Sequence, residues 1–331
     1  MGQGSPSSGT LPEGFAGLKV QKRWLRGAVA LLLVLIIFLF LGKEMWKNWR
    51  QIPFEQIRFN YWLVILSYAC MFASFLTHAG VWKLMLAAYG AKLSYVHSFQ
   101  IVVTSQLGKY IPGKVWFALG RMYLAKEFGV PERVSIVSVA LESVLLVISG
   151  AVIALLTIVA PWAQNFPLKY SLLALIIVVC GLVVTHPRIF GRLVNLTTRM
   201  LKQESIQMNL TYAGMVGLLL LYSVCWFWQG IGFFFLIGSF YEIEMAKWPV
   251  IWGIYALAWI TGFLSFLAPA GLGVREGLMT LLLSFYMPLS LAVVVALVAR
   301  IWSTVAEVLA FFVSLPAMRK WRSAELKREG S

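Results

Sequence analysis

Aspartate is absent from the sequence, in which all 13 acidic residues are glutamate. This absence excludes the Asp-x-Asp metal pairs on which many sugar and prenyl transferases depend. Charged residues make up only 12% of the 331 residues, against about 25% in a soluble domain. The chain also has no Gly-rich phosphate loop followed by Lys-Ser or Lys-Thr, and no motif that binds RNA or DNA. We therefore expect neither ATP hydrolysis nor nucleic-acid binding from this chain.

Cysteine and histidine are nearly as scarce. The cysteines, Cys70, Cys180 and Cys225, all lie in apolar segments, and their spacing matches neither a metal site nor a disulfide framework. We interpret them as small buried side chains. His78 and His97 are isolated in the sequence and are assigned to packing or helix-end hydrogen bonds. No metal and no cofactor are expected.

Long apolar runs dominate what is present, since 60% of the residues are hydrophobic. A membrane-spanning helix needs about 20 such residues. The sequence predicts an all-α, multi-pass membrane protein with about seven or eight transmembrane helices. Two further segments, 94–118 and 273–288, are ambiguous because the first is polar and the second is short. The apolar runs cover about 27–42, 61–88, 134–160, 170–185, 210–239, 248–268 and 289–315.

The chain divides into one membrane domain and two short ends. Residues 1–18 are rich in Gly, Ser and Pro and are expected to form a disordered tail. Residues 19–318 are predicted to form a single transmembrane domain, in which 27–160 and 170–315 would be the two halves. Residues 319–331 are expected to form a basic cytoplasmic tail.

The net charge of +15 gives the expected orientation, because cytoplasmic loops carry the excess of Lys and Arg. If 94–118 enters and leaves on one side, most loop cations share the cytoplasmic side with both termini. If it crosses fully, most later cations would face outside. A re-entrant hairpin that turns near Pro112-Gly113 is therefore favoured, in the cytoplasmic membrane.

The same count of charges does not determine how the second ambiguous region crosses the membrane. Segments 248–268 and 273–288 are either two crossings or one re-entrant hairpin that enters from the outside. The second choice would place a Pro/Gly hairpin in each half, from opposite faces, which is typical of inverted-repeat transporters. An inverted repeat is therefore a hypothesis at this point.

The stretch 105–121 carries polar, backbone-breaking residues inside an apolar sequence. Lys109 and Lys114 flank Pro112-Gly113, where an ideal helix cannot continue and backbone amides stay unpaired. Ammonium groups beside such amides form a site for an anion such as phosphate. The alternative is that both lysines reach lipid phosphates at the membrane surface without selectivity. The candidate binding residues here are Gln106, Lys109, Tyr110, Pro112, Gly113, Lys114 and Arg121.

Backbone breakers precede a cation again later in the chain. Pro269, Gly271 and Gly273 interrupt the backbone, and Arg275 follows them. Arg can hold a phosphate through two parallel hydrogen bonds, which Lys cannot do. Glu276 either caps the next helix, where the helix dipole favours a carboxylate, or acts at the site.

The last apolar run contains a polar stripe. Arg300, Ser303, Thr304 and Glu307 are spaced to share one helix face, which must face the protein interior. Either Arg300 pairs with Glu307, or each of them pairs with a neighbouring helix.

Glu142 is another carboxyl in an apolar segment. It could carry a proton, or it could be the fixed counter-ion of Lys109, Lys114 or Arg121. We group it with Glu276 and Glu307 as residues that balance charge or couple transport to protons.

Several of these motifs, in order, resemble the transmembrane region of the lysylphosphatidylglycerol synthase family. In fused bacterial members this region moves aminoacylated phosphatidylglycerol to the outer leaflet, while a soluble domain makes the lipid. Relatives are also associated with polyprenyl-phosphate glycolipid and hopanoid pathways. Lys114 and Trp116 stand where smaller, Gly-rich residues would be expected. The resemblance covers about 25–318 and rests on Gly108-Lys-Tyr-Ile-Pro112-Gly113, Gly120-Arg121, Glu142, Pro269-Ala-Gly-Leu-Gly-Val-Arg275-Glu276 and Arg300.

The resemblance implies lipid handling, and we do not expect the synthase activity. The leading hypothesis is a flippase or scramblase, not an enzyme, whose cationic cavity receives an anionic or phosphate-bearing lipid headgroup. Arg275 and Arg300 would join the cations of the first motif, and Pro269, Gly271 and Gly273 would shape the second half of the site. The alternative is a membrane scaffold or accessory subunit of a separate lipid synthase or glycosyltransferase. Association with such an enzyme, or as an oligomer, is a further hypothesis.

Overall fold

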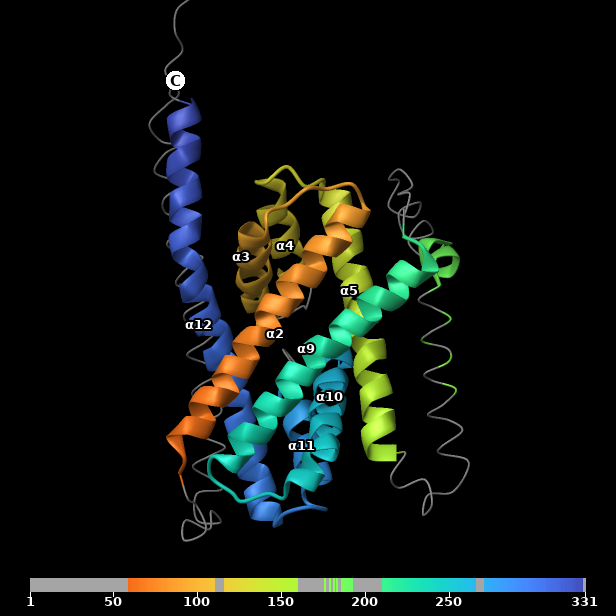
Figure 1. Cartoon of the computed structure of the whole chain (residues 1–331), viewed down its shortest axis with the longest axis vertical. Coiled ribbons are helices and arrows are strands. Elements are labelled where there is room, and N and C mark those ends of the chain that lie inside the picture. The colour runs from red at the N-terminus through yellow and green to blue at the C-terminus, as the bar shows by residue number, and fades with distance from the viewer. Residues whose placement is uncertain are drawn as a thin grey trace, which may run out of the picture.

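The computed structural model describes residues 59–110, 116–159, 186–192, 210–265 and 271–329, with four isolated positions between 176 and 183 and with side chains up to residue 316. Within these residues every regular element is a helix (Figure 1). The elements are α2 (Tyr61–Ala88), α3 (Tyr95–Gln106), the 3-10 helix η3 (Leu107–Tyr110), α4 (Trp116–Lys126), α5 (Glu132–Ala154), the π-helical turn η4 (Leu155–Val159), α9 (Tyr212–Gly238), the 3-10 helix η5 (Met245–Lys247), α10 (Trp248–Leu264), α11 (Val274–Leu283) and α12 (Leu289–Glu329).

Four helices are long and apolar enough to cross a membrane, so the protein is a multi-pass membrane protein. They are Tyr61–Ala88, Glu132–Ile158, Tyr212–Gly238 and Leu289–Pro316, and they match four predicted runs to within two residues. The run predicted at 248–268 forms a helix of 17 residues that ends at Leu264. The run predicted at 27–42 and nearly all of 170–185 lie outside the described residues.

Side-chain caps fix where several of these helices begin. The Asn60 side chain accepts hydrogen bonds from the backbone N–H groups of Trp62 and Leu63 at the start of α2. Thr211 does the same for Gly214 at the start of α9. Such caps satisfy amides that have no partner within the helix.

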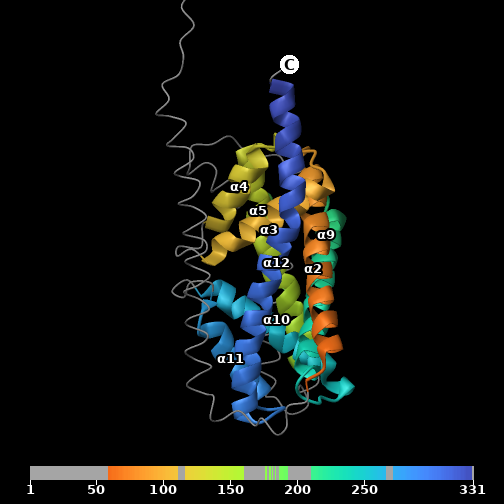
Figure 2. The ribbon, with the colours of Figure 1, turned by 90° about the vertical axis from the view of Figure 1, so that its left-hand side faces the viewer.

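Helices α3 and α4 form a short hairpin. They have 12 and 11 residues, which gives a length of about 18 Å or less, well short of the roughly 30 Å hydrocarbon core of a bilayer. The two helices pack against each other, and α3 begins at the end of the molecule where α4 ends (Figures 1 and 2). Gly108 permits this close return, because a Cβ there would lie 2.8 Å from the backbone of Trp116 and Phe117.

Helices α10 and α11 form a second hairpin at the opposite end of the molecule (Figure 2). Here the close approach is between Gly262 and Gly271, since a Cβ on Gly271 would lie 2.5 Å from the Cα of Gly262. Gly271 and Gly273 have φ values of 70° and 82°, in the left-handed region that favours glycine. The glycines predicted to break the backbone here therefore have a clear structural role.

The two hairpins belong to units that pack in the same way. In the first unit α2, α3, α4 and α5 contact one another in sequence, and in the second α9, α10, α11 and α12 do so. Across the units, α3 packs against α12 just as α10 packs against α5, while α2 packs along α9. In Figure 1, α2 rises toward the upper end whereas α9 descends from it. The two units therefore share one packing pattern and run in opposite directions.

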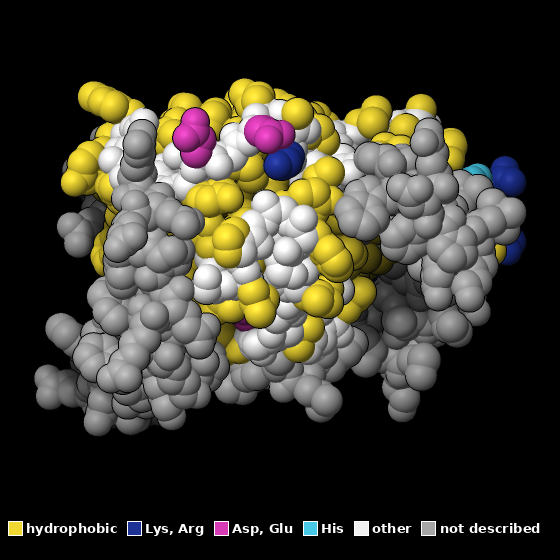
Figure 3. Space-filling view, turned by 90° about the horizontal axis from the view of Figure 1, so that it is seen from below, with side chains coloured by type: hydrophobic (Ala, Val, Ile, Leu, Met, Phe, Trp, Pro, Cys, Tyr) yellow, Lys and Arg dark blue, Asp and Glu magenta, His cyan; other side chains and the backbone are white. Residues whose placement is uncertain are grey.

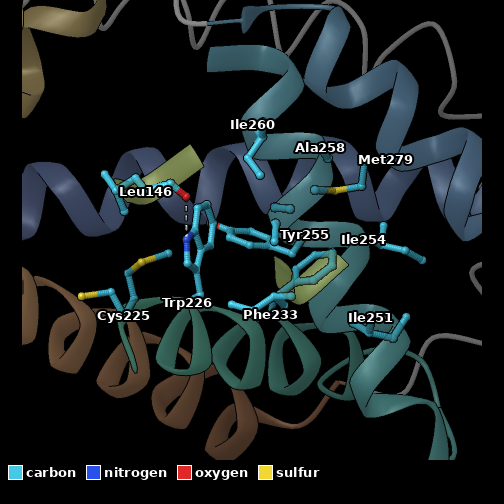
Figure 4. Packing of buried hydrophobic residues seen from close by; sticks show 14 of the residues in the cluster. Leu146, Cys225, Trp226, Phe233, Ile251, Ile254, Tyr255, Ala258, Ile260 and Met279 are labelled. Carbon is cyan, nitrogen blue, oxygen red and sulfur yellow. Dashed lines mark hydrogen bonds between the residues drawn. The ribbon is translucent and has the colours of Figure 1, made fainter. Parts of the chain in front are cut away.

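The core lies where the two units meet. Trp226 and Phe233 of α9 pack against Tyr255 of α10 (Figure 4). The Trp226 indole N–H donates to the carbonyl of Leu146 on α5 at 3.2 Å. Cys70 and Cys225 are buried free thiols, as predicted for those two positions.

Among the described residues, the two ends of the molecule differ in charge. The loops at the α10–α11 end carry Glu242, Glu244 and Lys247, and the described side chains on this face in Figure 3 include many hydrophobic and few charged groups. The described residues at the other end include Lys92, Lys126, Arg133, Arg188 and Arg192. Helix α12 continues at that end to Glu329, so the basic segment predicted at 319–331 is helical over nearly all its length.

Candidate functional site

The tips of the two hairpins meet at one internal cavity. Its volume is about 90 Å³, and its wall includes at least one side chain from each of α2, α3, α4, α5, α9, α10, α11 and α12. Gln106 and Lys109 come from the tip of the first hairpin, and Arg275 comes from the tip of the second. Cationic side chains from two hairpin tips that lie far apart in the sequence thus line the same cavity.

Lys109 is held by α12. Its ammonium group forms an ion pair with Glu307, whose other oxygen accepts a hydrogen bond from the Tyr110 hydroxyl at 2.8 Å. The same hydroxyl lies 3.1 Å from the Thr304 hydroxyl. The polar stripe of α12 therefore faces the interior, as predicted, and anchors the tip of the first hairpin.

Arg300 pairs with the second hairpin rather than with Glu307. Its Nη1 lies 3.7 Å from an oxygen of Glu276, and its guanidinium is 5.9 Å from the centre of the Tyr110 ring. The other oxygen of Glu276 accepts a hydrogen bond from the Gly273 N–H at 2.7 Å. Glu276 therefore caps α11 and also balances a buried cation, so both interpretations of this residue apply.

Arg275 reaches the cavity from the first turn of α11. It is buried, and its guanidinium lies 5.0 Å from the centre of the Tyr255 ring. Its Nη2 atom is buried without a hydrogen-bond partner among the described residues. An unsatisfied guanidinium N–H at a cavity is suited to an oxyanion that enters from outside.

A third charged cluster joins α4 to α5. Arg121 of α4 is fully buried, donates from Nε to the Ser105 hydroxyl at 3.1 Å, and forms an ion pair with Glu142. Its guanidinium also lies 5.1 Å from the centre of the Trp82 ring. Of the counter-ion roles proposed for Glu142, the structure shows the one toward Arg121. The other carboxylate oxygen lies 3.0 Å from Nε2 of His78.

The predicted site residues thus fall into four groups. Gln106, Lys109, Glu142, Arg275 and Glu307 line the cavity. Tyr110, Arg121, Glu276 and Arg300 support it from behind, and Gly271 and Gly273 shape the second tip. Pro112, Gly113, Lys114 and Pro269 lie outside the described residues.

Sequence reasoning missed several cavity residues. His78, for which packing or a helix-end hydrogen bond is predicted, does pack against Tyr222, but it also lines the cavity with Ser74, one helical turn before it on α2. Gln229 and Trp226 share a face of α9 in the same way, and the Gln229 amide donates to the Ser74 hydroxyl at 3.1 Å. The available signal was the spacing of polar residues by three or four within apolar helices. His97 does pack, with its ring stacked 4.2 Å from that of Phe128.

Among the described residues, the charges around the cavity nearly balance. Four cations, Lys109, Arg121, Arg275 and Arg300, face three carboxylates, Glu142, Glu276 and Glu307. The described part of the site thus carries one excess positive charge. Within the described residues, no three His, Cys or acidic side chains converge as metal ligands would.

Comparison with known proteins identifies the family. The family described as the lysylphosphatidylglycerol synthase TM region matches residues 24–310. No curated protein matches the chain. Because the family match spans most of the 331 residues, the chain belongs to the family of the lysylphosphatidylglycerol synthase transmembrane region, a family of membrane proteins related to lipid handling.

Proposed function

We propose that this protein is a lipid transporter, a flippase or scramblase, which moves a phosphate-bearing lipid across the cytoplasmic membrane. Aminoacylated phosphatidylglycerol and polyprenyl-phosphate-linked sugars are candidate substrates. The observation that carries the proposal is that two distant hairpin tips bring Lys109 and Arg275 to one cavity inside the helix bundle. Family membership supports a role in lipid handling.

The cost of these cations argues for a function. A Lys or Arg at the centre of a transmembrane helix costs about 2.5–3.5 kcal/mol on insertion scales. Lys109 supplies a mobile point charge and Arg275 a planar fork of donors, a combination suited to a phosphate. The lipid tails would remain in the bilayer while the headgroup passes between these cations.

The cavity is too small to hold a lipid headgroup. Its volume of about 90 Å³ is below the roughly 300–1,000 Å³ of typical ligand pockets. A lipid headgroup therefore requires the bundle to open. The Lys109–Glu307 and Arg300–Glu276 pairs join the hairpin tips to α12, so these contacts would change when it does.

We further propose that the hairpins α3–α4 and α10–α11 are re-entrant segments from opposite membrane faces, and that the two units form an inverted repeat. Opposite running directions and equivalent helix contacts support this proposal. Discontinuous helices that meet near the bilayer midplane are typical of substrate sites in such transporters. The end with more cations would be cytoplasmic, together with both termini.

The proposal assigns no catalytic step to the chain. Each of the carboxylates Glu142, Glu276 and Glu307 faces a cation. That arrangement suits charge balance better than general-base catalysis, in which the carboxylate must reach a substrate proton.

Reconstitution into liposomes tests the function. The labelled lipids would include phosphatidylglycerol, its lysyl ester and a polyprenyl-phosphate sugar, and the assay would follow loss of label from one leaflet. We expect the wild-type protein to accelerate the movement of at least one of them. The variants Lys109→Gln and Arg275→Gln should move lipid more slowly than the wild type. Lys126→Gln is the matched control and should move lipid at the wild-type rate, because Lys126 pairs with Glu132 on the surface, at 2.5 Å.

Two outcomes would contradict the proposal. No acceleration of any lipid in the panel would exclude transport of these substrates. If Lys109→Gln and Arg275→Gln left the lipid composition of both leaflets unchanged in cells, a scaffold role would account for the protein better.

A further inference from the structure

Two interfaces between the units flank the cavity. Helix α3 packs against α12 toward one end of the molecule, and α5 packs against α10 toward the other (Figure 1). Gln106 and Glu307 line the cavity from the first interface, and Leu146 and Trp259 line it from the second. A headgroup that enters between the two units therefore has to separate one of these interfaces.

The α5–α10 interface is apolar and closely packed. A Cβ on Gly150 of α5 would lie 2.8 Å from Cδ1 of Ile260, and a Cβ on Gly253 of α10 would lie 2.0 Å from the Thr157 hydroxyl oxygen. The Thr157 hydroxyl itself donates to the carbonyl of Ile153, one turn before it, at 2.7 Å. These contacts offer a polar headgroup neither space nor an uncommitted donor.

The α3–α12 interface, in contrast, is polar. Gln100 of α3 is 3% exposed, and its amide donates to the carbonyl of Ser314 on α12 at 3.1 Å. The Oε1 atom of Gln100 and the hydroxyl oxygen of Thr104, one turn further along α3, are buried without a hydrogen-bond partner among the described residues. Buried polar atoms are nearly always paired, because an unpaired one is costly. Both atoms would gain partners if the interface separated and admitted a headgroup.

An ion pair closes this interface beside the cavity. Lys109 follows α3 in the first unit, and Glu307 belongs to α12 in the second. This charged contact has to break when the units separate here. Other ion pairs of the described site join residues of the same unit and would move with it, namely Arg121–Glu142 and Glu276–Arg300.

A phosphate can replace Glu307 as the partner of Lys109. The Lys109 side chain is 25% exposed, whereas that of Glu307 is 9% exposed, so an anion can approach the ammonium group before the pair breaks. Glu307 keeps a donor after the exchange, because the Tyr110 hydroxyl donates to its second oxygen at 2.8 Å. Exchange of one oxyanion for another also avoids the cost of leaving a buried charge unpaired.

We infer that the α3–α12 interface is the path of the lipid headgroup into the cavity, and that the phosphate of the lipid opens it by taking Lys109 from Glu307. The polar atoms of Gln100 and Thr104 line this path. The inference rests on the proposed function and names how its site is opened. The α5–α10 interface stays closed during this step, and no covalent bond is made or broken.

Distances between spin labels test the opening. In a cysteine-free background in nanodiscs, Val96→Cys and Val313→Cys report on the α3–α12 interface, and Leu156→Cys and Met245→Cys report on the α5–α10 interface. All four side chains are exposed. We expect dihexanoyl phosphatidylglycerol to lengthen the first distance and to leave the second unchanged. If the first distance does not lengthen, or if the second lengthens as well, the inference is wrong.

Two further ligands identify the source of the phosphate. Dihexanoylglycerol has the same tails without a phosphate, and inorganic phosphate has no tails to hold it at the interface. At the same concentration, neither should lengthen the α3–α12 distance. Opening by dihexanoylglycerol would show that the phosphate is not required. Opening by inorganic phosphate would assign the site to a free anion, and either result would overturn the inference.

Removal of Glu307 tests the ion pair. Glu307→Gln should show the longer α3–α12 distance without any ligand, because Lys109 no longer has a charged partner on α12. Glu132→Gln, which loses a surface pair with Lys126, is the matched control and should stay closed. A Glu307→Gln variant with the wild-type distance would contradict the role of the ion pair.

A substitution of Gln100 tests the path. Gln100→Met should slow lipid transport by about two- to tenfold, the effect of one neutral hydrogen bond, because the headgroup loses a polar partner. Ser98→Ala is the control, since Ser98 is buried on the same helix but donates to the carbonyl of Ala79 on α2. It should transport at the wild-type rate, and a wild-type rate for Gln100→Met as well would contradict the path.

The outcomes separate this inference from the proposed function. If lipid moves in liposomes but the α3–α12 distance does not respond to the phosphate lipid, the proposed function stands and the inference fails. If no lipid moves, the proposed function fails, and the distances still decide whether a phosphate lipid opens the interface. If Glu307→Gln does not fold, the wild-type distances with and without lipid decide the matter.

Discussion

Lys109 and Glu307 are 198 positions apart in the chain and form an ion pair on the wall of the cavity. The pair fastens the tip of the first hairpin to α12, the helix that also pairs with the second hairpin through Arg300 and Glu276. Helix α12 therefore contacts both tips. A phosphate that binds Lys109 would compete with Glu307 for its ammonium group.

Variants of this pair should affect protein stability and lipid transport differently. We expect Lys109→Gln to slow transport by about tenfold or more, because a hydrogen bond to a charged group contributes about 1.5–3 kcal/mol. Glu307→Gln leaves Lys109 without its partner and should lower the melting temperature in detergent. The double variant Lys109→Gln/Glu307→Gln should recover that temperature without recovering transport. A double variant that transports at the wild-type rate would show that Lys109 does not bind the lipid.

Glu142→Gln should be strongly destabilising. The pair of Arg121 and Glu142 is almost completely buried, and removal of one partner of such a pair costs about 3–5 kcal/mol because the other charge stays buried and unpaired. Denaturant unfolding in detergent measures this difference. Glu132→Gln is the matched control, since Glu132 pairs with Lys126 at the surface, and it should unfold as wild type. Equal stabilities for the two variants would refute the counter-ion role of Glu142.

Gly271→Ala should prevent the second hairpin from closing. A φ of 70° costs an alanine about 1–2 kcal/mol, and the new Cβ would lie 2.5 Å from the Cα of Gly262. We expect a loss of folded protein on gel filtration. Gly277→Ala is the control, because Gly277 lies inside α11 and a Cβ there would meet nothing within 4 Å beyond its own helical backbone. This control should be neutral or stabilise by up to about 1 kcal/mol.

Cysteine labelling should reveal the topology of both hairpins. In a cysteine-free background, Lys92→Cys and Lys126→Cys flank the first hairpin, and Lys247→Cys and Phe285→Cys flank the second. We expect a membrane-impermeant reagent to label the first two positions from the cytoplasm and the last two from outside. Labelling of Lys92→Cys and Lys126→Cys from opposite sides would mean that 94–118 crosses the membrane.

The sequence was sufficient to predict the long helices and the places where the backbone breaks. Long apolar runs identify α2, α5, α9 and α12 because each must match the thickness of the bilayer. Gly108, Gly271 and Gly273 mark the two tips, because a Cβ at Gly108 would clash and the other two have positive φ values. The predicted breaks at Pro112-Gly113 and Pro269 lie outside the described residues. That both tips bring cations to one cavity was also part of the hypothesis, and Lys109 and Arg275 do line it.

The partners of the charged residues could not be predicted. Helical spacing places Arg300 and Glu307 on one face of α12, but it does not reveal that their partners, Glu276 and Lys109, come from two different hairpins. His78 was missed for the same reason. Its polar partner Glu142 lies on another helix, and only the packing of α2 beside α5 brings them together.

The repeated packing of the two units has an energetic consequence. If the units exchange conformations, equivalent helix contacts form again, and the cavity opens toward the other leaflet. Helix packing would then favour neither the state open to one leaflet nor the state open to the other. The bundle by itself would move lipid only until its chemical potential is the same in both leaflets. Accumulation in one leaflet requires a bias from elsewhere, such as lipid synthesis on one side of the membrane.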